Sequence, residues 1–354
     1  MFIDNPLILK KLEIFNHNLI KEAIYLLEQN KKKFLIIKNS KGYFLGVLND
    51  GDIRRGLIKN FSLNDKVEKI FNRSPFYLNK KINNDQAKIL FKKHDIDFIP
   101  YIIKKKFSGF YYKKDILLTG DIKIRKHPNH IVVMAGGKGT RLKEFTKNNP
   151  KPMLVVNGKP ILESIIGNGV LQGFENFIIT INYLGSKIKK YFNDGSKFYA
   201  KISYVKESKP LGTAGSLFFL KKYIFDDFIV TNGDLVSNIK YEEIIKSHIK
   251  NKADFTVGIK LDRWNCSYGV VELKGEKVES IKEKPVINLN LVAGVYVLSP
   301  KLLNLIKKPD YLDMTDFIKI LIKKNKKIFA FPIYESWQDV GNYKDFLKLK
   351  KKLV

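Results

Sequence analysis

Cysteine, arginine and long apolar runs are all scarce in this chain of 354 residues. Its single cysteine, Cys266, excludes a disulfide framework and a cysteine-rich metal site. No apolar run approaches the roughly 18 residues that a membrane-spanning helix needs. The segment from Met1 to Asn18 also lacks the basic and then apolar regions of a secretory signal. We therefore expect a cytoplasmic protein that does not enter a membrane.

Acidic residues are in the minority as well, with 35 against 65 lysines and arginines, which gives a formal net charge of +30. Dense positive charge attracts phosphate, so nucleic-acid binding is one function class to weigh. Only six basic residues are arginine, the side chain preferred for phosphate recognition, and the lysines spread along the whole chain. The composition thus favours a solvated lysine-rich surface over a nucleic-acid interface.

The residues that are abundant suffice for two folded domains. The chain is 44% apolar and 12% aromatic, and single cores seldom grow beyond ~250 residues. Residues 120–129 are polar, contain glycine and proline, and show no clear periodicity. This pattern predicts a linker between a domain of residues 1–119 and a domain of residues 130–354.

The first domain contains a weak internal repeat. Residues 46–53, Gly-Val-Leu-Asn-Asp-Gly-Asp-Ile, align with residues 109–116 at an offset of 63 (109 − 46). A helical pattern and an apolar run precede each copy, which predicts a helix–strand–strand–helix unit that occurs twice in one small α+β module. This half resembles a tandem CBS-domain pair (a Bateman module), whose repeated Asp can hold the ribose of an adenine nucleotide. The resemblance makes Asp52 and Asp115 candidate ligands, while the simpler alternative is that both cap the following helices.

The second domain alternates strand and helix patterns, as expected of an α/β domain with a mostly parallel sheet. Its predicted strands are short and apolar on both faces, as buried parallel strands tend to be. They are residues 131–134, 177–180, 228–231, 255–258 and 293–297.

A glycine-rich turn directly follows the first of these strands. Residues 136–142 read Gly-Gly-Lys-Gly-Thr-Arg-Leu, and such a turn lets backbone N–H groups approach a phosphate. The spacing matches neither a Walker A loop nor a G-x-G-x-x-G fingerprint. Lys151 stands between Pro150 and Pro152, which restrict the backbone on both sides. Arg141 and Lys151 are therefore candidates for the fixed positive charges that phosphoryl transfer needs.

These two motifs resemble the signature of the sugar-1-phosphate nucleotidylyltransferases, whose Rossmann-like domain has a mixed, mostly parallel sheet. Six further segments occur in the order that this family shows, so the resemblance covers residues 130–354. They are Leu-Gly-Thr-Ala-Gly at 211–215, Asn-Gly-Asp at 232–234, Tyr-Gly-Val-Val at 268–271, Glu-Lys-Pro at 283–285, Ala-Gly-Val-Tyr at 293–296 and Trp-Gln-Asp-Val-Gly at 337–341.

The resemblance implies a role for each matching residue. The nucleotide would contact Ala135, Gly136, Gly137, Gly139, Thr140, Gly212, Thr213 and Ala214. Asn182, after the predicted strand 177–180, could flank the nucleobase or belong to a simple loop. The sugar phosphate would contact Tyr268, Gly269, Glu283, Lys284 and Gly294, with Lys284 on the phosphate and Glu283 on the sugar hydroxyls. Asp234 and Asp339 would hold Mg²⁺, which prefers a few carboxylates beside phosphate oxygens and waters; a turn residue and a helix cap are the alternatives. Glu207 could contact either ligand or form a surface salt bridge.

The implied reaction joins a nucleoside triphosphate to a sugar 1-phosphate and releases pyrophosphate. The attacking phosphate oxygen is ionised near neutral pH, so no general base is needed, and no catalytic histidine motif is evident. A CBS pair before a short transferase domain resembles the guanylyltransferases that act on glucosamine 1-phosphate in bacterial legionaminic acid synthesis. GTP and glucosamine 1-phosphate are therefore the predicted substrates. Guanylyl- or uridylyltransfer to mannose or heptose phosphates and a non-catalytic nucleotide sensor are the alternatives, and we expect a homo-oligomer.

Overall fold

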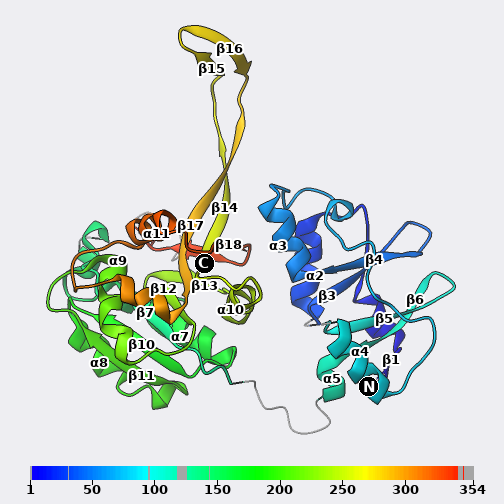
Figure 1. Cartoon of the computed structure of the whole chain (residues 1–354), viewed down its shortest axis with the longest axis horizontal. Coiled ribbons are helices and arrows are strands. Elements are labelled where there is room, and N and C mark those ends of the chain that lie inside the picture. The colour runs from blue at the N-terminus through cyan, green and yellow to red at the C-terminus, as the bar shows by residue number, and fades with distance from the viewer. Residues whose placement is uncertain are drawn as a thin grey trace. The chain divides into compact units, whose positions relative to one another are not determined.

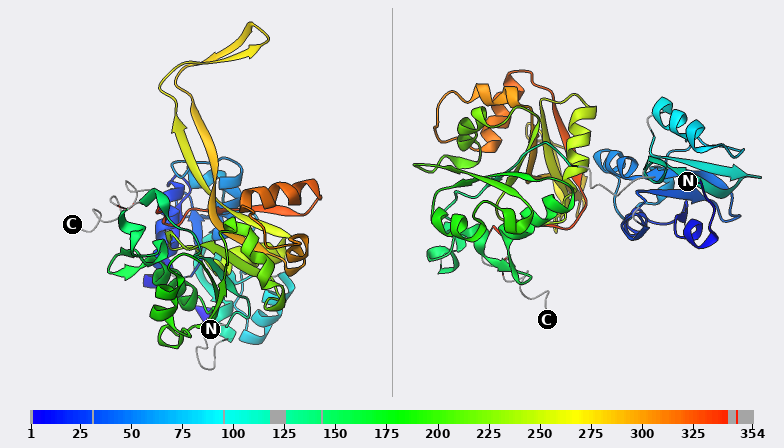
Figure 2. Two further views of the ribbon diagram at one scale, coloured as in Figure 1. Left: turned by 90° about the vertical axis from the view of Figure 1, so that its left-hand side faces the viewer. Right: turned by 90° about the horizontal axis from the view of Figure 1, so that it is seen from below.

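The computed structural model describes residues 2–30, 32–94, 96–117, 126–142, 144–341 and 346. The chain divides into two compact units, Met1–Lys123 and Ile124–Val354 (Figure 1, Figure 2). Positions 120–125 of the predicted linker lie outside the described residues. Within the described ranges, no helix is both long and apolar enough to cross a membrane.

Unit 1 contains the helix–strand–strand–helix unit twice, so the predicted repeat is confirmed. The first copy comprises α2 (Ile20–Asn30), β3 (Phe34–Lys38), β4 (Phe44–Asn49) and α3 (Asp50–Ile58). The second copy comprises α4 (Asn84–His94), β5 (Phe98–Ile103), β6 (Lys106–Tyr112) and α5 (Lys113–Leu117). Two short strands, β1 (Phe2–Ile3) and β2 (Glu13–Phe15), flank α1 (Pro6–Lys10) and complete the sheets β1-β6-β5 and β2-β3-β4.

The two copies share one core. Phe34 of the first copy stacks on Phe98 of the second, with ring centroids 3.8 Å apart, and meets Phe110 edge-on. The aligned glycines Gly46 and Gly109 each adjoin a shift in the strand register. A backbone oxygen of another segment lies 2.1 Å from a Cβ built at Gly46 and 2.9 Å from one built at Gly109. Neither position has room for a side chain, which explains why the repeat keeps both glycines.

Unit 2 is organised around a seven-stranded sheet with the order β11-β10-β7-β12-β17-β14-β18. Four neighbours are parallel: β11 (Lys201–Lys206), β10 (Asn176–Ile181), β7 (Ile131–Met134) and β12 (Phe228–Asn232). The strand β17 (Val286–Leu298) is antiparallel to β12 and to β14 (Phe255–Asn265), and β18 (Ile328–Ile333) is parallel to β14. The sheet is mixed and mostly parallel, and it contains all five predicted strands.

Helices cover both faces of this sheet, and its central strands, such as β7, are apolar on both sides. One face packs on α7 (Ile161–Leu171), α8 (Gly185–Phe192) and α10 (Tyr241–Lys250). The other packs on α9 (Gly212–Gly215) and α11 (Met314–Lys323). Along β7, Ile131 and Val133 belong to the first core and Val132 to the second. The other short elements are α6 (Glu144–Lys147), β8 (Val155–Val156), β9 (Lys159–Pro160), β13 (Leu235–Ser237) and β19 (Trp337–Asp339).

A two-stranded arm projects from unit 2, and we define it as residues 259–292. The strands β14 and β17 continue past the sheet as a ribbon, which ends in the hairpin of β15 (Val270–Lys274) and β16 (Lys277–Lys282) (Figure 1, Figure 2). Their pairing runs without irregularity from Ile259 opposite Val292 to Asn265 opposite Val286.

Candidate active site

A pocket of about 290 Å³ opens where β7, β10 and β12 end. Parallel strands present their carboxyl ends at one edge of the sheet, and ligands of α/β folds bind at that edge. Seven predicted site residues line this pocket: Ala135, Gly136, Gly137, Lys151, Gly212, Thr213 and Asp234. Nine further residues complete its wall: Met134, Pro152, Thr180, Glu207, Pro210, Leu211, Asn232, Gly233 and Tyr311.

Lys151 and Asp234 form an ion pair inside the pocket. The lysine opens a short 3₁₀ helix, Lys151–Met153, directly after Pro150, so its stem is held as the two prolines predict. Asp234 follows β12, where the close approach of the Met134 carbonyl leaves no room for a side chain at Gly233. A positive charge is thereby placed beside a carboxylate at the carboxyl edge of the sheet.

The second predicted metal ligand lies on a strand paired to the segment after Asp234. Leu235 of β13 is the register partner of Asp339 in β19, and Val340 N–H donates to the Asp234 carbonyl at 3.1 Å. Within the described residues, the buried Oδ1 of Asp234 accepts no hydrogen bond. Leaving a buried acceptor unsatisfied is costly, and a cation would remove that cost.

These donors fit Mg²⁺. The described residues contain no cluster of three or more His, Cys, Asp or Glu side chains that could enclose a metal. Mg²⁺ does not need one, because it binds through one or two carboxylates and fills its shell with phosphate oxygens and waters. Asp234 and Asp339 are therefore the side chains that would hold it.

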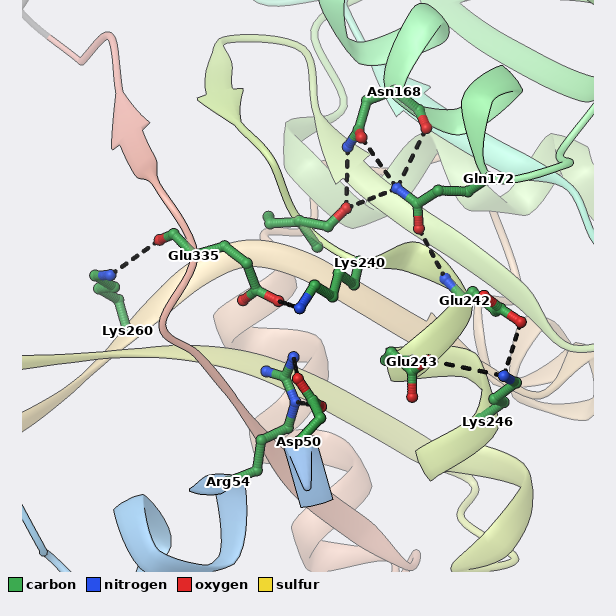
Figure 3. A network of polar contacts seen from close by, with 11 residues as sticks. Asp50, Arg54, Asn168, Gln172, Lys240, Glu242, Glu243, Lys246, Lys260 and Glu335 are labelled. Atoms are coloured by element: carbon green, nitrogen blue, oxygen red, sulfur yellow. Dashed lines mark hydrogen bonds and ion pairs between the residues drawn. The ribbon is translucent and has the colours of Figure 1, made fainter. Parts of the chain in front are cut away.

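A polar network anchors the segment after Asp234 and the segment before Asp339 (Figure 3). Asn168 of α7 and Gln172, the C-cap residue of that helix, both donate to the Ile239 carbonyl, at 3.0 and 2.9 Å. The next residue, Lys240, places its Nζ 4.0 Å from Oε1 of the buried Glu335, which lies just before β19. The β13–β19 pair is thus tied to the helical layer.

The glycine loop after β7 has one position that demands glycine. Gly139 has a φ of +64°, and a Cβ there would lie 2.9 Å from Cγ2 of Thr146 and 3.2 Å from Cβ of Lys151. The Thr146 hydroxyl also donates to the Gly139 carbonyl at 3.0 Å. The loop therefore packs directly against Lys151, the predicted catalytic residue. Arg141 is exposed and does not line the pocket, while the side chain of Thr140 lies outside the described part of the structure.

Glu207 lies behind the glycine loop instead of on the surface. Its carboxylate oxygens are 2.9 and 3.0 Å from the position of a Cβ on Gly136. Burial raises the pKa of Glu207, although hydrogen bonds from the Leu211 N–H and from the Thr180 and Ser216 hydroxyls oppose the rise. The predicted nucleotide contact Asn182 donates to the Glu207 carbonyl at 3.1 Å, so it holds this strand end in place.

The loop of residues 211–215 is held by residues about a hundred positions later. Oδ1 of Asp313 accepts from the Thr213 N–H at 3.2 Å, and Tyr311 donates to Oδ2 of Asp313 at 2.9 Å. Ala214 N–H donates to the Leu312 carbonyl at 2.8 Å, so Ala214 packs beneath the pocket. Sequence reasoning missed Tyr311 and Asp313, because no motif surrounds them. Thr180 and Asn232, by contrast, lie within the predicted strand 177–180 and the Asn-Gly-Asp motif at 232–234, and could have been found.

The predicted sugar-phosphate residues divide into two groups. Gly294 lies at the pocket, because a Cβ there would be 2.7 Å from Nδ2 of Asn232. Tyr268, Gly269, Glu283 and Lys284 lie on the arm, where the three side chains are 69–78% exposed. None of these four lines the pocket.

The two aspartates predicted as ligands in unit 1 have protein partners. Asn49 and Asp52 form a capping box at the start of α3, with hydrogen bonds of 3.0 and 2.9 Å. Arg55 adds an ion pair to Asp52 at 2.5 Å. Asp115 pairs with Lys32 at 2.8 Å. For Asp52, the structure therefore shows the capping role that was the alternative interpretation.

The profile of the Nucleotidyl transferase family matches residues 130–354, which carry this pocket. The chain belongs to the nucleotidyl transferase family. The chain is similar to Bifunctional protein GlmU of Methanocaldococcus jannaschii, with 33% identity over 231 residues that cover 63% of the chain and 54% of the relative. It is also similar to Mannose-1-phosphate guanyltransferase of Yarrowia lipolytica, with 29% identity over 228 residues and 61% of each chain covered.

Among solved structures, the nucleotidyl transferase resembles HddC from Yersinia pseudotuberculosis complexed with GMP-PN. The identity is 28% and the TM-score 0.51, over 64% of this chain and 100% of that one. The chain spans about half to three fifths of the length of the curated relatives named above.

Proposed function

We propose that residues 130–354 transfer a nucleotidyl group from GTP to a sugar 1-phosphate, with glucosamine 1-phosphate as the favoured acceptor. The observation that carries this proposal is the convergence of the glycine loop, Lys151 and Asp234 on one pocket in a nucleotidyl transferase fold. Mannose and heptose 1-phosphates are the alternative acceptors.

The chemistry follows from the pocket's residues. A sugar phosphate oxygen bonds to the α-phosphorus of the triphosphate, the bond from that phosphorus to the bridging oxygen breaks, and pyrophosphate leaves. The attacking oxygen is already ionised, so no side chain removes a proton. The backbone of Gly136 and Gly137 lies where the phosphates would bind, and Lys151 places a fixed charge beside them. Bound between Asp234 and Asp339, Mg²⁺ would supply further neutralisation of phosphate charge.

Two similarities support guanine as the base. One relative is named as a mannose-1-phosphate guanyltransferase, and the HddC structure is described as complexed with GMP-PN. The preference for glucosamine 1-phosphate rests on the resemblance of the two-domain arrangement to legionaminic-acid guanylyltransferases.

Pyrophosphate release from a panel of triphosphates and sugar 1-phosphates tests the proposal. We expect GTP with glucosamine 1-phosphate to turn over fastest, and Asp234→Asn and Asp339→Asn each to lower kcat at least ~10²-fold. Asp316→Asn, on the exposed side of α11, is the matched control and should keep full activity. No turnover with any pair would refute the enzyme assignment, and a preference for UTP would refute the choice of base.

For unit 1, we propose a tandem CBS module that binds an adenine nucleotide beside Asp115. The duplicated helix–strand–strand–helix unit supports the module, and the partly exposed ion pair of Asp115 with Lys32 can open more readily than the more deeply buried Asp52 cap. AMP and ATP should raise the melting temperature of the wild type and leave Asp115→Asn unchanged. A wild-type chain that shows no shift in melting temperature or turnover with either nucleotide would contradict this proposal.

A further inference from the structure

Where the ribbon of the arm meets the hairpin, it carries a compact group of predicted site residues that do not line the pocket. Oε2 of Glu283 is 3.1 Å from the position of a Cβ on Gly269, and Cys266 N–H donates to the Pro285 carbonyl at 3.1 Å. Between them, Lys284 has a φ of +44°, in the left-handed region that is unfavourable for lysine. We define Tyr268, Gly269, Glu283 and Lys284 as the arm cluster.

A rigid pivot at its base would leave this cluster well away from the base of the arm. The base lies at the pocket, since Gly294 packs on the pocket residue Asn232. From Val292 to Val286 the extended strand measures about 20 Å, and Lys284 lies two residues beyond. A rigid ribbon keeps its far end at that distance from the base, whichever way it turns. The paired stretches 259–265 and 286–292 contain no glycine or proline that would allow a sharp bend.

The arm also exposes more apolar surface than an isolated ribbon should. Twelve large apolar residues between Trp264 and Val292 are each 36–78% exposed. They include the neighbouring pairs Val286–Ile287 and Leu291–Val292, so apolar side chains are exposed on both faces of the ribbon. Two-stranded ribbons are marginally stable alone in water, so this surface calls for a protein partner.

The charge of the arm indicates which partner fits. Residues 259–292 contain six basic and five acidic residues, a net charge of 6 − 5 = +1, whereas the chain as a whole carries +30. Two copies of so basic a chain repel each other over most of their surfaces. The near-neutral arm can approach a second copy with little of this repulsion, and it offers no excess charge to an acidic partner.

We propose that the arm docks on a second copy of this chain and places Glu283 and Lys284 at the sugar-phosphate side of that copy's pocket. The proposal rests on the transferase function proposed above, and it makes each site a composite of two chains. In a twofold dimer the exchange is reciprocal, so one dimer holds two complete sites.

Mixed dimers test this directly. One chain carries Lys151→Ala in its pocket, the other carries Lys284→Ala in its arm, and different affinity tags allow the co-expressed hybrid to be purified. Each parent dimer has two defective sites. The hybrid combines an intact pocket with an intact arm from the other chain, so it should recover about half of the wild-type turnover. A hybrid as inactive as its parents would show that the arm acts on its own pocket and would overturn the proposal. Full activity of the Lys284→Ala parent would overturn it as well. Asp234→Asn serves as a second pocket variant, so that misfolding of Lys151→Ala does not decide the outcome.

Sedimentation equilibrium measures dimerisation through the arm independently of catalytic activity. We expect the wild type to be a dimer and the pair Leu273→Lys and Ile281→Lys, on exposed apolar positions of the hairpin, to weaken dimerisation at least ~10-fold. Leu171→Lys changes an exposed leucine elsewhere in unit 2 and should leave the dimer intact. A monomeric wild type would refute docking whatever its activity. A wild-type dimer that turns over no substrate would refute the proposed function alone.

Discussion

Replacing Lys151 with methionine probes the centre of the pocket, because methionine preserves the length of the stem and removes the charge. The Lys151 side chain is only 11% exposed and its carboxylate partner on Asp234 is 20% exposed. Loss of one preorganised positive group should lower kcat at least ~10²-fold, or about 3 kcal/mol in the barrier. Asp234 then keeps a mostly buried charge without its ammonium partner, which should lower the free energy of unfolding by about 1–2 kcal/mol.

The two effects are measured separately, by pyrophosphate release at saturating substrate and by urea unfolding. Lys159→Met is the matched control, since Lys159 is an exposed lysine whose Nζ lies 3.6 Å from Oε1 of Glu163. This surface pair should contribute less than about 0.5 kcal/mol, and its loss should leave kcat unchanged. Adding Asp234→Asn to Lys151→Met should restore stability without restoring activity. A Lys151→Met variant with kcat within about threefold of wild type would refute the assignment of a catalytic charge to Lys151.

Three further predictions follow from the local geometry. Gly139→Ala should lose about 1–2 kcal/mol of unfolding free energy, because its φ is +64°, whereas Gly137→Ala has open space and should change little; equal losses in urea unfolding would contradict this. Burial raises the pKa of Glu207, so the folded chain binds this proton more tightly than the unfolded chain, and the group's contribution to stability is lost as the pH rises through the folded value. Glu207→Gln should therefore be more stable than wild type at about pH 8, with a difference that shrinks as the pH falls toward 4.5; a pH-independent difference would exclude the raised pKa. Asp52→Ala removes half of the capping box of α3 and should cost unit 1 about 1 kcal/mol, measured by hydrogen exchange of α3; unchanged protection would show that the cap contributes nothing.

Much of the fold could be predicted because its signals are local. The segment 131–134 is apolar throughout, and such a short run between turns indicates a strand that is covered on both faces. The aligned glycines 46 and 109 revealed the repeat of unit 1, because the same close backbone approach requires glycine in both copies. The prolines around Lys151 indicated a held lysine, and the structure places that lysine in the pocket.

Other parts of the site depend on contacts between distant segments. Tyr311 and Asp313 support the loop around Thr213, yet about a hundred residues separate them and no local pattern links the two. Arg141 belongs to the same motif as Gly139, but the turn of the short 3₁₀ helix leaves it exposed. Spacing along the chain does not fix which way a side chain points once a loop folds.

The sequence by itself determined the two-part organisation, the repeated unit and the buried strands, because periodicity and backbone restriction act within a few residues. Only the tertiary structure decided that Glu207 lies buried behind the glycine loop, and that the Glu283–Lys284 segment stands on the arm instead of in the pocket. Both outcomes depend on strand pairing over long separations in the chain. The register of β14 against β17, which no local motif records, sets how far Lys284 lies from Asp234.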